Sequence, residues 1–435
     1  MATIKSLLGR RHDLIPGAAH TYSKGDDQFP AVAPQAILKG KGVTVWGTDG
    51  KRYLDWCMGL RSVSLGHCHP VVNRAVAKQM LQGTNFGRPH VTEYILADFL
   101  IKTLPHVEMV KFAKNGSTVT TAATKLARAY TGRKYIAVCA SHPFFSYDDW
   151  FIWTTACDAG IPAEIKKLTL TFTYNDLASL KKLFVEHPGE IACVIMEVVT
   201  TQQPKAGFLK GVQDLCKKRG SVFIVDEMIT GFRWGLKGAV QTYGLKPDLV
   251  TYGKGIANGY SLAVLGGKKK IMELGGIHHK KERVFLISTT HGAEATSLAA
   301  ALTTIQFMKD RGVSRHIWKM GAKLKKGLER LVATHGLQKQ VEVYGFEPNL
   351  NMAFKDAKGV ASQLLRTFFL QEVIKRGILF QGYFALSYGH GPREIERTLK
   401  LFDRALEAFA LAVKAGDADK KLVGEPCKPV FRKYN

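Results

Sequence analysis

The chain has 435 residues, 46% of them hydrophobic, which suits a folded protein with one large or two smaller domains and excludes dominant disorder. Lysine and arginine (62) exceed aspartate and glutamate (36), so the formal net charge of +26 creates a field that attracts anions. We find no run of about 18 apolar residues and no signal-peptide core, so we expect a cytoplasmic protein without a membrane span.

Seven cysteines, at positions 57, 68, 139, 157, 193, 216 and 427, are scattered, odd in number and without a Cys-x-x-Cys pair. This pattern predicts reduced, packed thiols and argues against a zinc site or a disulfide framework. The basic residues occur in short runs such as 268–270, without a recognised nucleic-acid motif. A solvated basic surface is therefore favoured over nucleic-acid binding, and anionic small substrates stay compatible with the charge.

The first 65 residues are interpreted as an N-terminal segment that contains a β-hairpin. Apolar and polar residues alternate between Gly42 and Trp56, on either side of Thr48-Asp49-Gly50. Such alternation around a turn sequence is typical of a hairpin.

Residues 66–312 alternate between helical segments and short apolar strands. This alternation predicts a large α/β domain, in which a mainly parallel sheet is covered by helices. The expected helices span 70–82, 91–103, 118–130, 177–186, 211–218 and 295–309, and the expected strands span 135–139, 191–196, 222–225, 249–252 and 262–265.

Residues 313–435 are interpreted as a smaller α+β C-terminal domain. After a first helix from Val313, we expect strands near Val341 and Leu350, a helix over 363–376 and a last helix over 394–415. No repeat or low-complexity block interrupts this pattern.

Two residues at strand ends carry the chemical signal. Lys254 follows the apolar strand 249–252, and Asp226 ends the strand that precedes it. Such a lysine can form a Schiff base with the aldehyde of pyridoxal phosphate, while the carboxylate keeps the pyridine nitrogen protonated so that the ring accepts electrons. Either residue alone is weak evidence, because most lysines are solvated surface charges. The pair predicts an enzyme that acts on amino groups.

A phosphate site is expected at Asn115-Gly116-Ser117-Thr118, directly before a helix. Its hydroxyls and the positive end of the helix dipole favour phosphate, although a simple N-cap explains the same residues. Thr289 offers a further hydroxyl or is an ordinary loop residue. His142 follows a strand and either lies against a cofactor ring or is simply packed beside aromatic residues.

The sequence resembles the class III aminotransferases, most closely the glutamate-1-semialdehyde aminomutase branch. The resemblance implies a fold-type I pyridoxal-phosphate enzyme, active as a homodimer whose sites lie at the subunit interface. It covers nearly the whole chain and is carried by the motifs Ile15-Pro16-Gly17, Leu65-Gly66-His67-Cys68-His69-Pro70, Leu126-Ala127-Arg128-Ala129-Tyr130-Thr131-Gly132-Arg133, Asp226-Glu227-Met228-Ile229-Thr230-Gly231-Phe232-Arg233 and the Lys254 segment.

The resemblance also implies roles for single residues. Lys254 matches the Schiff-base lysine and Asp226 the partner of the pyridine nitrogen. Thr289 matches the threonine that the neighbouring subunit offers to the phosphate. The family's remaining cofactor contacts fall on Gly116, Ser117 and Thr118 at the phosphate, Met228 on one ring face and His142 on the other.

Some positions depart from the aminomutase pattern. Lys24 stands where the aminomutase uses an arginine for the substrate carboxylate, and Gly382 stands near its acidic gate residue. These changes favour a substrate other than glutamate 1-semialdehyde. Arg61 aligns close to a position that faces the substrate in many relatives, and its planar guanidinium suits a carboxylate or phosphate. A surface salt bridge explains Arg61 equally well.

The main prediction is a transaminase that moves an amino group from an amino-acid donor to a carbonyl acceptor through pyridoxamine phosphate, with an anionic small molecule favoured as the substrate. One alternative is an intramolecular aminomutase with the same lysine and cofactor. Another is a basic polyanion-binding protein on an inactive enzyme fold, which would bind nucleic acid in a salt-dependent way without any yellow cofactor.

Overall fold

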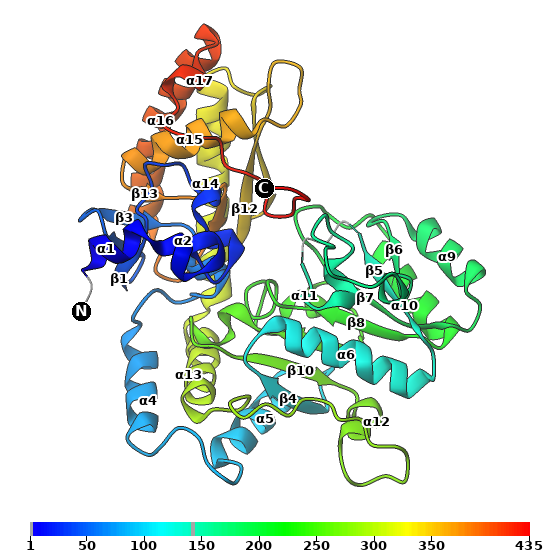
Figure 1. Cartoon of the computed structure of the whole chain (residues 1–435). Helices are drawn as coiled ribbons and strands as arrows, with labels where there is room; N and C mark the ends of the chain where they lie inside the picture. Colours follow the sequence, from blue (N-terminus) through cyan, green and yellow to red (C-terminus); the bar gives the residue numbers. More distant parts are fainter. Residues whose placement is uncertain (1–2, 141–143) are drawn as a thin grey trace. The chain divides into compact units, whose positions relative to one another are not determined.

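The computed structural model describes residues 3–140 and 144–435, and its contacts divide the chain into two compact units (Figure 1). We call them the sheet unit (Arg61–Ser64, His69–Arg315 and Arg432–Asn435) and the terminal unit (Met1–Leu60, Leu65–Cys68 and His316–Phe431). The division into 1–65, 66–312 and 313–435 stays a prediction.

The sheet unit is built on one seven-stranded sheet with the order β4-β10-β9-β8-β7-β5-β6 (Figure 1). The pairs within β9-β8-β7-β5-β6 are parallel, and β10 runs antiparallel to both β9 and β4. This arrangement confirms the predicted α/β class. The strands are β4 (Met109–Ala113), β5 (Tyr135–Cys139), β6 (Thr169–Phe172), β7 (Ile191–Glu197), β8 (Val222–Asp226), β9 (Leu249–Tyr252) and β10 (Ala263–Gly267).

The central strands are buried over their whole length. Every residue of β7, β8 and β9 is buried, which explains why these segments are continuously apolar up to their last residues. β7 and β8 each extend one residue beyond the predicted end, to Glu197 and Asp226. β4 and β6 were not predicted, because these short strands are only partly buried and carry no clear apolar run.

Helix α6 (Gly116–Thr131) packs on the sheet, where it contacts β4, β7, β8, β9 and β10 (Figure 1). It begins at Asn115, whose side chain accepts the N–H of Thr118, and ends at Gly132, which has a left-handed φ of 67°. The other helices of this unit are α4 (Pro70–Met80), α5 (Val91–Thr103), α7 (Asp149–Ile152), α8 (Ala163–Lys166), α9 (Leu177–Glu186), α10 (Phe208–Arg219), α11 (Gly238–Thr242), α12 (Lys269–Met272) and α13 (Ala295–Arg311).

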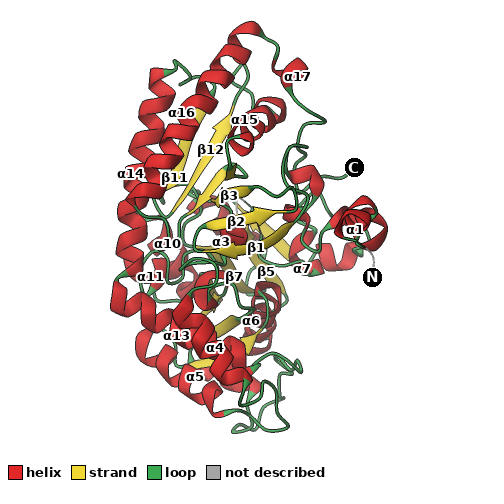
Figure 2. Cartoon of the chain, turned by 90° about the vertical axis from the view of Figure 1, so that its left-hand side faces the viewer, coloured by secondary structure: helices red, strands yellow, loops and turns green. Residues whose placement is uncertain are grey.

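Helices α4 and α5 both pack against α13, and Figure 2 shows the three together. The chain between α4 and α5 is exposed from Leu81 to Pro89, apart from half-buried Gly83. This exposed segment contributes to the cavity described below.

The terminal unit combines segments from the N-terminal and C-terminal parts of the chain. The predicted hairpin is confirmed: β2 (Thr44–Gly47) pairs antiparallel with β3 (Arg52–Asp55). β3 also pairs in parallel with β13 (Ile378–Leu379), more than 300 residues later in the sequence, so the N-terminal segment is part of a sheet with C-terminal residues. The remaining elements are α1 (Ile4–Gly9), α2 (Arg11–Leu14), β1 (Ile37–Lys41), β11 (Val341–Phe346), β12 (Asn349–Phe354), α15 (Gln363–Lys375), β14 (Tyr383–Ala385), α16 (Pro392–Ala415) and α17 (Ala418–Lys421).

Two helical elements, α14 (Val313–Thr334) and the turn α3 (Met58–Arg61), each cross the boundary between the units. In the part of the chain that the structure describes, no helix is both long enough and apolar enough to span a membrane. Within the same residues, no group of three His, Cys, Asp or Glu side chains is arranged to hold a metal ion.

Candidate active site

The structure brings Lys254 and Asp226 to the same end of two neighbouring strands. Asp226 is the last residue of β8, and its register partner on β9 is Thr251, three residues before Lys254. The carboxyl ends of parallel strands are the edge where α/β sheets bind ligands. Lys254 has a left-handed φ of 46°, a conformation that costs a non-glycine residue about 1–3 kcal/mol and that clusters at functional sites.

The Asp226 carboxylate has one satisfied oxygen and one unsatisfied oxygen. Oδ1 accepts the N–H of Met228 at 2.7 Å. Oδ2 is buried and has no hydrogen-bond partner within residues 3–140 and 144–435, although the Thr251 hydroxyl is near enough to favour the ionised form. Burial raises the pKa of Asp226, and the neighbouring Lys254 ammonium lowers it. A buried carboxylate oxygen without a donor fits the protonated ring nitrogen of pyridoxal phosphate.

The Lys254 amine lies in an electrostatic environment that favours its neutral form. Burial lowers the pKa of Lys254, and the guanidinium groups of Arg61 and Arg233 lower it further. The carboxyl groups of Asp226 and Glu197 act in the opposite direction. A neutral amine is the form that attacks an aldehyde or accepts a proton, so this environment suits both tasks.

Met228 links the lysine turn to the phosphate turn. A Cβ atom added to Gly116 would lie 3.2 Å from Met228 Sδ, and one added to Gly253 would lie 2.5 Å from the same atom. The thioether therefore fills the space between the start of α6 and the residue before Lys254. It packs directly against the backbone of both glycines. This contact places Gly116, Met228 and Lys254 around one small volume.

The start of α6 fits both interpretations made from the sequence, an N-cap and a phosphate site. Asn115 is a true N-cap, because its Oδ1 accepts the N–H of Thr118 at 2.9 Å. The N–H groups of Gly116 and Ser117 have no acceptor within the helix and stay suited to an anion. The Ser117 hydroxyl is buried and accepts the N–H of Tyr147 at 3.1 Å. The turn therefore fits a phosphate group beside Met228.

Arg61 is held close to the lysine turn. The Ser64 hydroxyl donates to the carbonyl of Gly255 at 2.9 Å, which ties the segment 61–64 to the residue after Lys254. The Arg61 carbonyl accepts Nη2 of buried Arg233 at 3.0 Å. Arg61 is half-buried, with a left-handed φ of 73°. Its position next to Lys254 fits an anion-binding role better than a surface salt bridge.

Two other candidate residues, Lys24 and Gly382, belong to the terminal unit. Lys24 is exposed in the turn Tyr22–Lys24. Gly382 has a left-handed φ of 92°. His142 lies outside the described residues, so its predicted contact with the ring stays a prediction.

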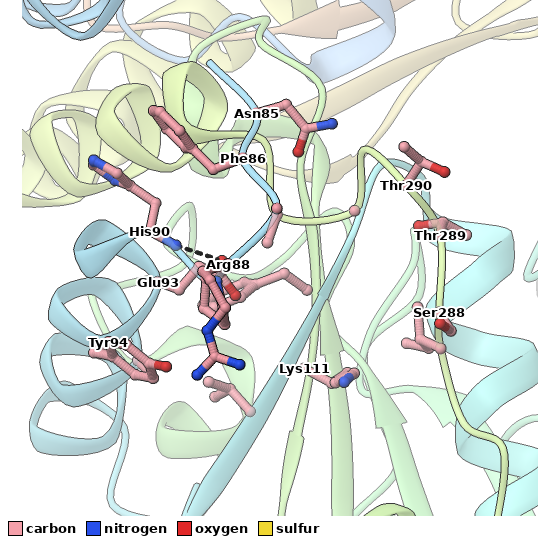
Figure 3. Close-up of a pocket in the computed structure, with 18 of the residues that line it drawn as sticks. Asn85, Phe86, Arg88, His90, Glu93, Tyr94, Lys111, Ser288, Thr289 and Thr290 are labelled. Carbon is pink, nitrogen blue, oxygen red and sulfur yellow. Dashed lines mark hydrogen bonds between the residues drawn. The ribbon is translucent and has the colours of Figure 1, made fainter. Parts of the chain in front are cut away.

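Thr289 is part of a separate cavity of about 480 Å³, which lies wholly within the sheet unit (Figure 3). Figure 3 shows residues of the segment between α4 and α5 opposite Ser288, Thr289 and Thr290, with Lys111 of β4 below them. The carboxylate of Glu93 accepts the N–H of His90 at 3.1 Å and caps α5. Lys254 is not among the residues that line this cavity.

Sequence reasoning missed Glu197. It is the last residue of β7 and the register partner of Asp226, and only 4% of it is exposed. The predicted strand ended at Met196, so this acid was not seen as a strand-end residue. A carboxylate directly after an apolar strand next to the Asp226 strand was the signal that could have found it.

Glu227, next to Asp226, has a structural role. It is fully buried, and its Oε1 accepts the N–H of Val240 at 2.6 Å while its Oε2 accepts the N–H of Ala239 at 3.2 Å and the hydroxyl of Thr230. Burial raises the pKa of Glu227 to about 7. The carboxylate thus fastens the loop after β8 to α11, which keeps the backbone around Asp226 in place.

Comparisons with known proteins agree with this geometry. The family model for class III aminotransferases matches residues 22–382. A glutamate-1-semialdehyde 2,1-aminomutase from Thermus thermophilus is 32% identical over 427 residues, which cover 91% of this chain and 96% of that protein.

Solved structures give the same picture. The FumI protein of Sphingopyxis sp. MTA144, solved in its PLP internal aldimine form, has a TM-score of 0.86 at 26% identity, over 94% of this chain and 97% of that one. A glutamate-1-semialdehyde aminomutase from Pseudomonas aeruginosa PAO1 has a TM-score of 0.77 at 21% identity, over 93% of this chain and 97% of that one, and supports the fold alone. The chain belongs to the class III aminotransferases, a pyridoxal-phosphate-dependent family, and is similar to members of its glutamate-1-semialdehyde aminomutase branch.

Proposed function

We propose that this chain uses pyridoxal phosphate to move an amino group on a small carbonyl substrate. The observation that carries the proposal is the buried Oδ2 of Asp226, which lacks a donor among the described residues, beside the lowered pKa of Lys254. When bound, the cofactor supplies an electron sink that makes a proton next to the nitrogen acidic. Lys254 would hold the cofactor through its aldehyde, and the amine, once the substrate amine has displaced it, would move that proton between carbon atoms. Asp226 would keep the ring nitrogen protonated.

The other residues hold and orient the reactants. The N–H groups at the start of α6 would hold the phosphate group, and Met228 would pack against one face of the ring. Arg61 binds an anionic group of the substrate close to the Lys254 amine, which orients the substrate and adds a positive charge that keeps the amine neutral. These assignments rest on the contacts around Met228 and on the Ser64–Gly255 hydrogen bond.

An intramolecular amino transfer of the aminomutase type is the favoured reaction. Similarity to aminomutases over 91% of the chain supports it better than it supports the intermolecular transaminase predicted from the sequence. The transaminase is the second candidate, because Lys24 and Gly382 replace residues that the resemblance associates with glutamate 1-semialdehyde.

Acceptor dependence separates the two reactions. The purified holoprotein is mixed with amino donors, and the visible band of the bound cofactor and the release of a keto acid are followed. An aminomutase converts its substrate to an isomer without an added acceptor, whereas a transaminase releases one keto acid per amino group moved. A colourless protein that binds neither the cofactor nor an amino donor but binds nucleic acid would support the polyanion-binding alternative instead.

We also propose that a second copy of the chain covers the cavity of Figure 3. Its rim carries apolar side chains that are costly to leave in water, among them Tyr94, which is 63% exposed, and Phe86. Leu81, in the segment between α4 and α5, and Val91 and Ile95, in α5, are also exposed apolar residues. A second copy would bury this surface and bring Thr289 to a neighbouring active site, as the resemblance implies.

Tyr94→Asp is expected to weaken this assembly, because it places a charge in the centre of the apolar surface. Size-exclusion chromatography with light scattering should then show a monomer at concentrations where the unchanged chain is a dimer. Val185→Asp is the matched control, since Val185 is 69% exposed on α9, away from the cavity lining. A monomeric unchanged chain, or a Tyr94→Asp variant that dimerises normally, would contradict the proposal.

A further inference from the structure

Glu197 is a second buried carboxyl group beside Asp226. The two residues are register partners on the adjacent parallel strands β7 and β8, so their side chains leave the sheet at neighbouring positions at the same edge. They are 4% and 1% exposed. The functions assigned above use Asp226 and Lys254 but leave Glu197 without a role.

The surroundings of Glu197 contain charges of both signs. β7 pairs with β8 on one side and with β5 on the other. The Tyr174 hydroxyl donates to the carbonyl of Val198 at 2.8 Å, and burial raises the pKa of Tyr174, so this group stays protonated. The titratable groups that face Glu197 are Asp226 and Glu227 from the end of β8, Lys254 after β9, Arg61, Tyr174 after β6, and Cys139 at the end of β5.

Ionising both of two neighbouring buried carboxyl groups is energetically unfavourable, because neither charge is solvated and the two repel each other. One proton therefore remains on the pair. The groups around Asp226 decide where that proton lies. The Met228 N–H and the nearby Thr251 hydroxyl both favour the ionised form of Asp226. We propose that Glu197 is a positioning residue that holds this proton, and that as a neutral acid it keeps the negative charge on Asp226 for the cofactor ring nitrogen. This inference rests on the proposed function.

The electrostatics agree with this assignment. Burial raises the pKa of Glu197, and the Asp226 carboxylate raises it further. Lys254 and Arg61 lower it, but their effect is smaller than that of burial. At neutral pH, Glu197 is therefore expected to be a neutral acid. At higher pH it ionises and adds a second negative charge near Lys254.

Infrared spectroscopy of the holoprotein tests where the proton lies. A neutral carboxylic acid has a C=O stretching band that a carboxylate lacks, and this band shifts when the glutamates are labelled with carbon-13 but not when the aspartates are. We expect a glutamate band at neutral pH that disappears in Glu197→Gln and persists in Glu186→Gln, the matched control on exposed Glu186 of α9. Buried Glu227 adds a second glutamate band, which both variants retain.

The visible band of the bound cofactor gives an independent readout. Glutamine mimics the neutral acid, so Glu197→Gln should retain the visible spectrum at neutral pH. The pH at the midpoint of the visible-band titration should be lower in Glu197→Gln than in the unchanged chain. The reason is that the second negative charge, which ionised Glu197 adds near Lys254, never forms in this variant. Glu197→Asp should move the midpoint back towards that of the unchanged chain, as an ionisable group returns. A purely structural role would change cofactor retention or thermal stability without this pattern.

Several outcomes would overturn the inference. The neutral-acid band could shift with labelled aspartate, which would place the proton on Asp226. It could also remain in Glu197→Gln, or the titration midpoint could stay unchanged. If Glu197→Gln does not fold, two measurements still test the inference. Carbon-13 labelling of the unchanged chain shows whether a glutamate or an aspartate holds the proton, and the visible-band titration of Glu197→Asp shows whether an ionisable group at this position sets the midpoint. Failure of borohydride to fix a pyridoxyl group on the unchanged chain would instead refute the proposed function itself.

Discussion

Replacing Lys254 with alanine is expected to abolish turnover and leave the fold intact. The variant loses the amine that binds the cofactor aldehyde, and loss of the proton transfer alone slows the reaction by about 10²–10⁴-fold. Borohydride reduction followed by mass spectrometry of the peptide that contains position 254 should find a pyridoxyl group in the unchanged chain and none in the variant. Lys181→Ala, on exposed Lys181 of α9, should be modified normally at Lys254.

A glycine variant separates chemistry from backbone strain. Because φ is 46° at this position, Lys254→Gly should be thermally more stable than Lys254→Ala, and both should be inactive. Turnover by either variant at the rate of the unchanged chain would remove Lys254 from the mechanism. Equal unfolding temperatures for the two variants would show that the left-handed backbone carries no strain there.

Replacing Asp226 with asparagine is expected to slow proton abstraction by roughly 10²–10³-fold, the scale seen when one key electrostatic partner is removed. The amide leaves the ring nitrogen without a carboxylate, so the electron sink weakens. Single-turnover bleaching of the visible band with an amino donor measures this step directly. Asp214→Asn, on an exposed acid paired with Lys210 on α10, is the control and should react at the rate of the unchanged chain. A full rate in Asp226→Asn would contradict the assigned role.

The same substitution is expected to change how the stability of the cofactor-free protein depends on pH. The pKa of Asp226 is raised from its ordinary value of 3.8, so between that value and the raised pKa the folded state binds more protons than the unfolded state. The contribution of Asp226 to stability is therefore complete below pH 3.8 and is lost as the pH rises through the raised pKa. Urea unfolding from pH 4 to 7 should show this loss in the unchanged chain and a smaller loss in Asp226→Asn.

Several features were predictable because they depend on local sequence. The apolar runs of β7, β8 and β9 predicted the parallel sheet, since strands buried on both faces carry few polar residues. A helix was predicted from Thr118, and α6 begins two residues earlier, at Gly116, because Asn115 acts as the N-cap and accepts the N–H of Thr118. Lys254 and Asp226 were recognisable because each follows an apolar strand, and the structure places them at one sheet edge.

Other features required contacts between distant parts of the chain. The docking of β3 on β13 joins residues more than 300 positions apart, and no local pattern encodes that pairing. The cavity around Thr289 is formed with the segment between α4 and α5, about 200 residues earlier, so no local pattern indicated its lining. Met228 was placed against one ring face by resemblance, but its contacts with Gly116 and Gly253 came only from the packed structure.

By itself, the sequence determined which side chains are available for chemistry: an amine and a carboxylate at strand ends, hydroxyls at a helix start, and an arginine whose guanidinium suits an anion. Only the tertiary structure decided their neighbours and therefore their charge. Glu197 and Asp226 are separated by an entire helix in sequence, yet the register of β7 and β8 places them side by side. Because burial and neighbouring charges set a pKa, the proton between these two acids is a property of the packed sheet and of neither residue alone.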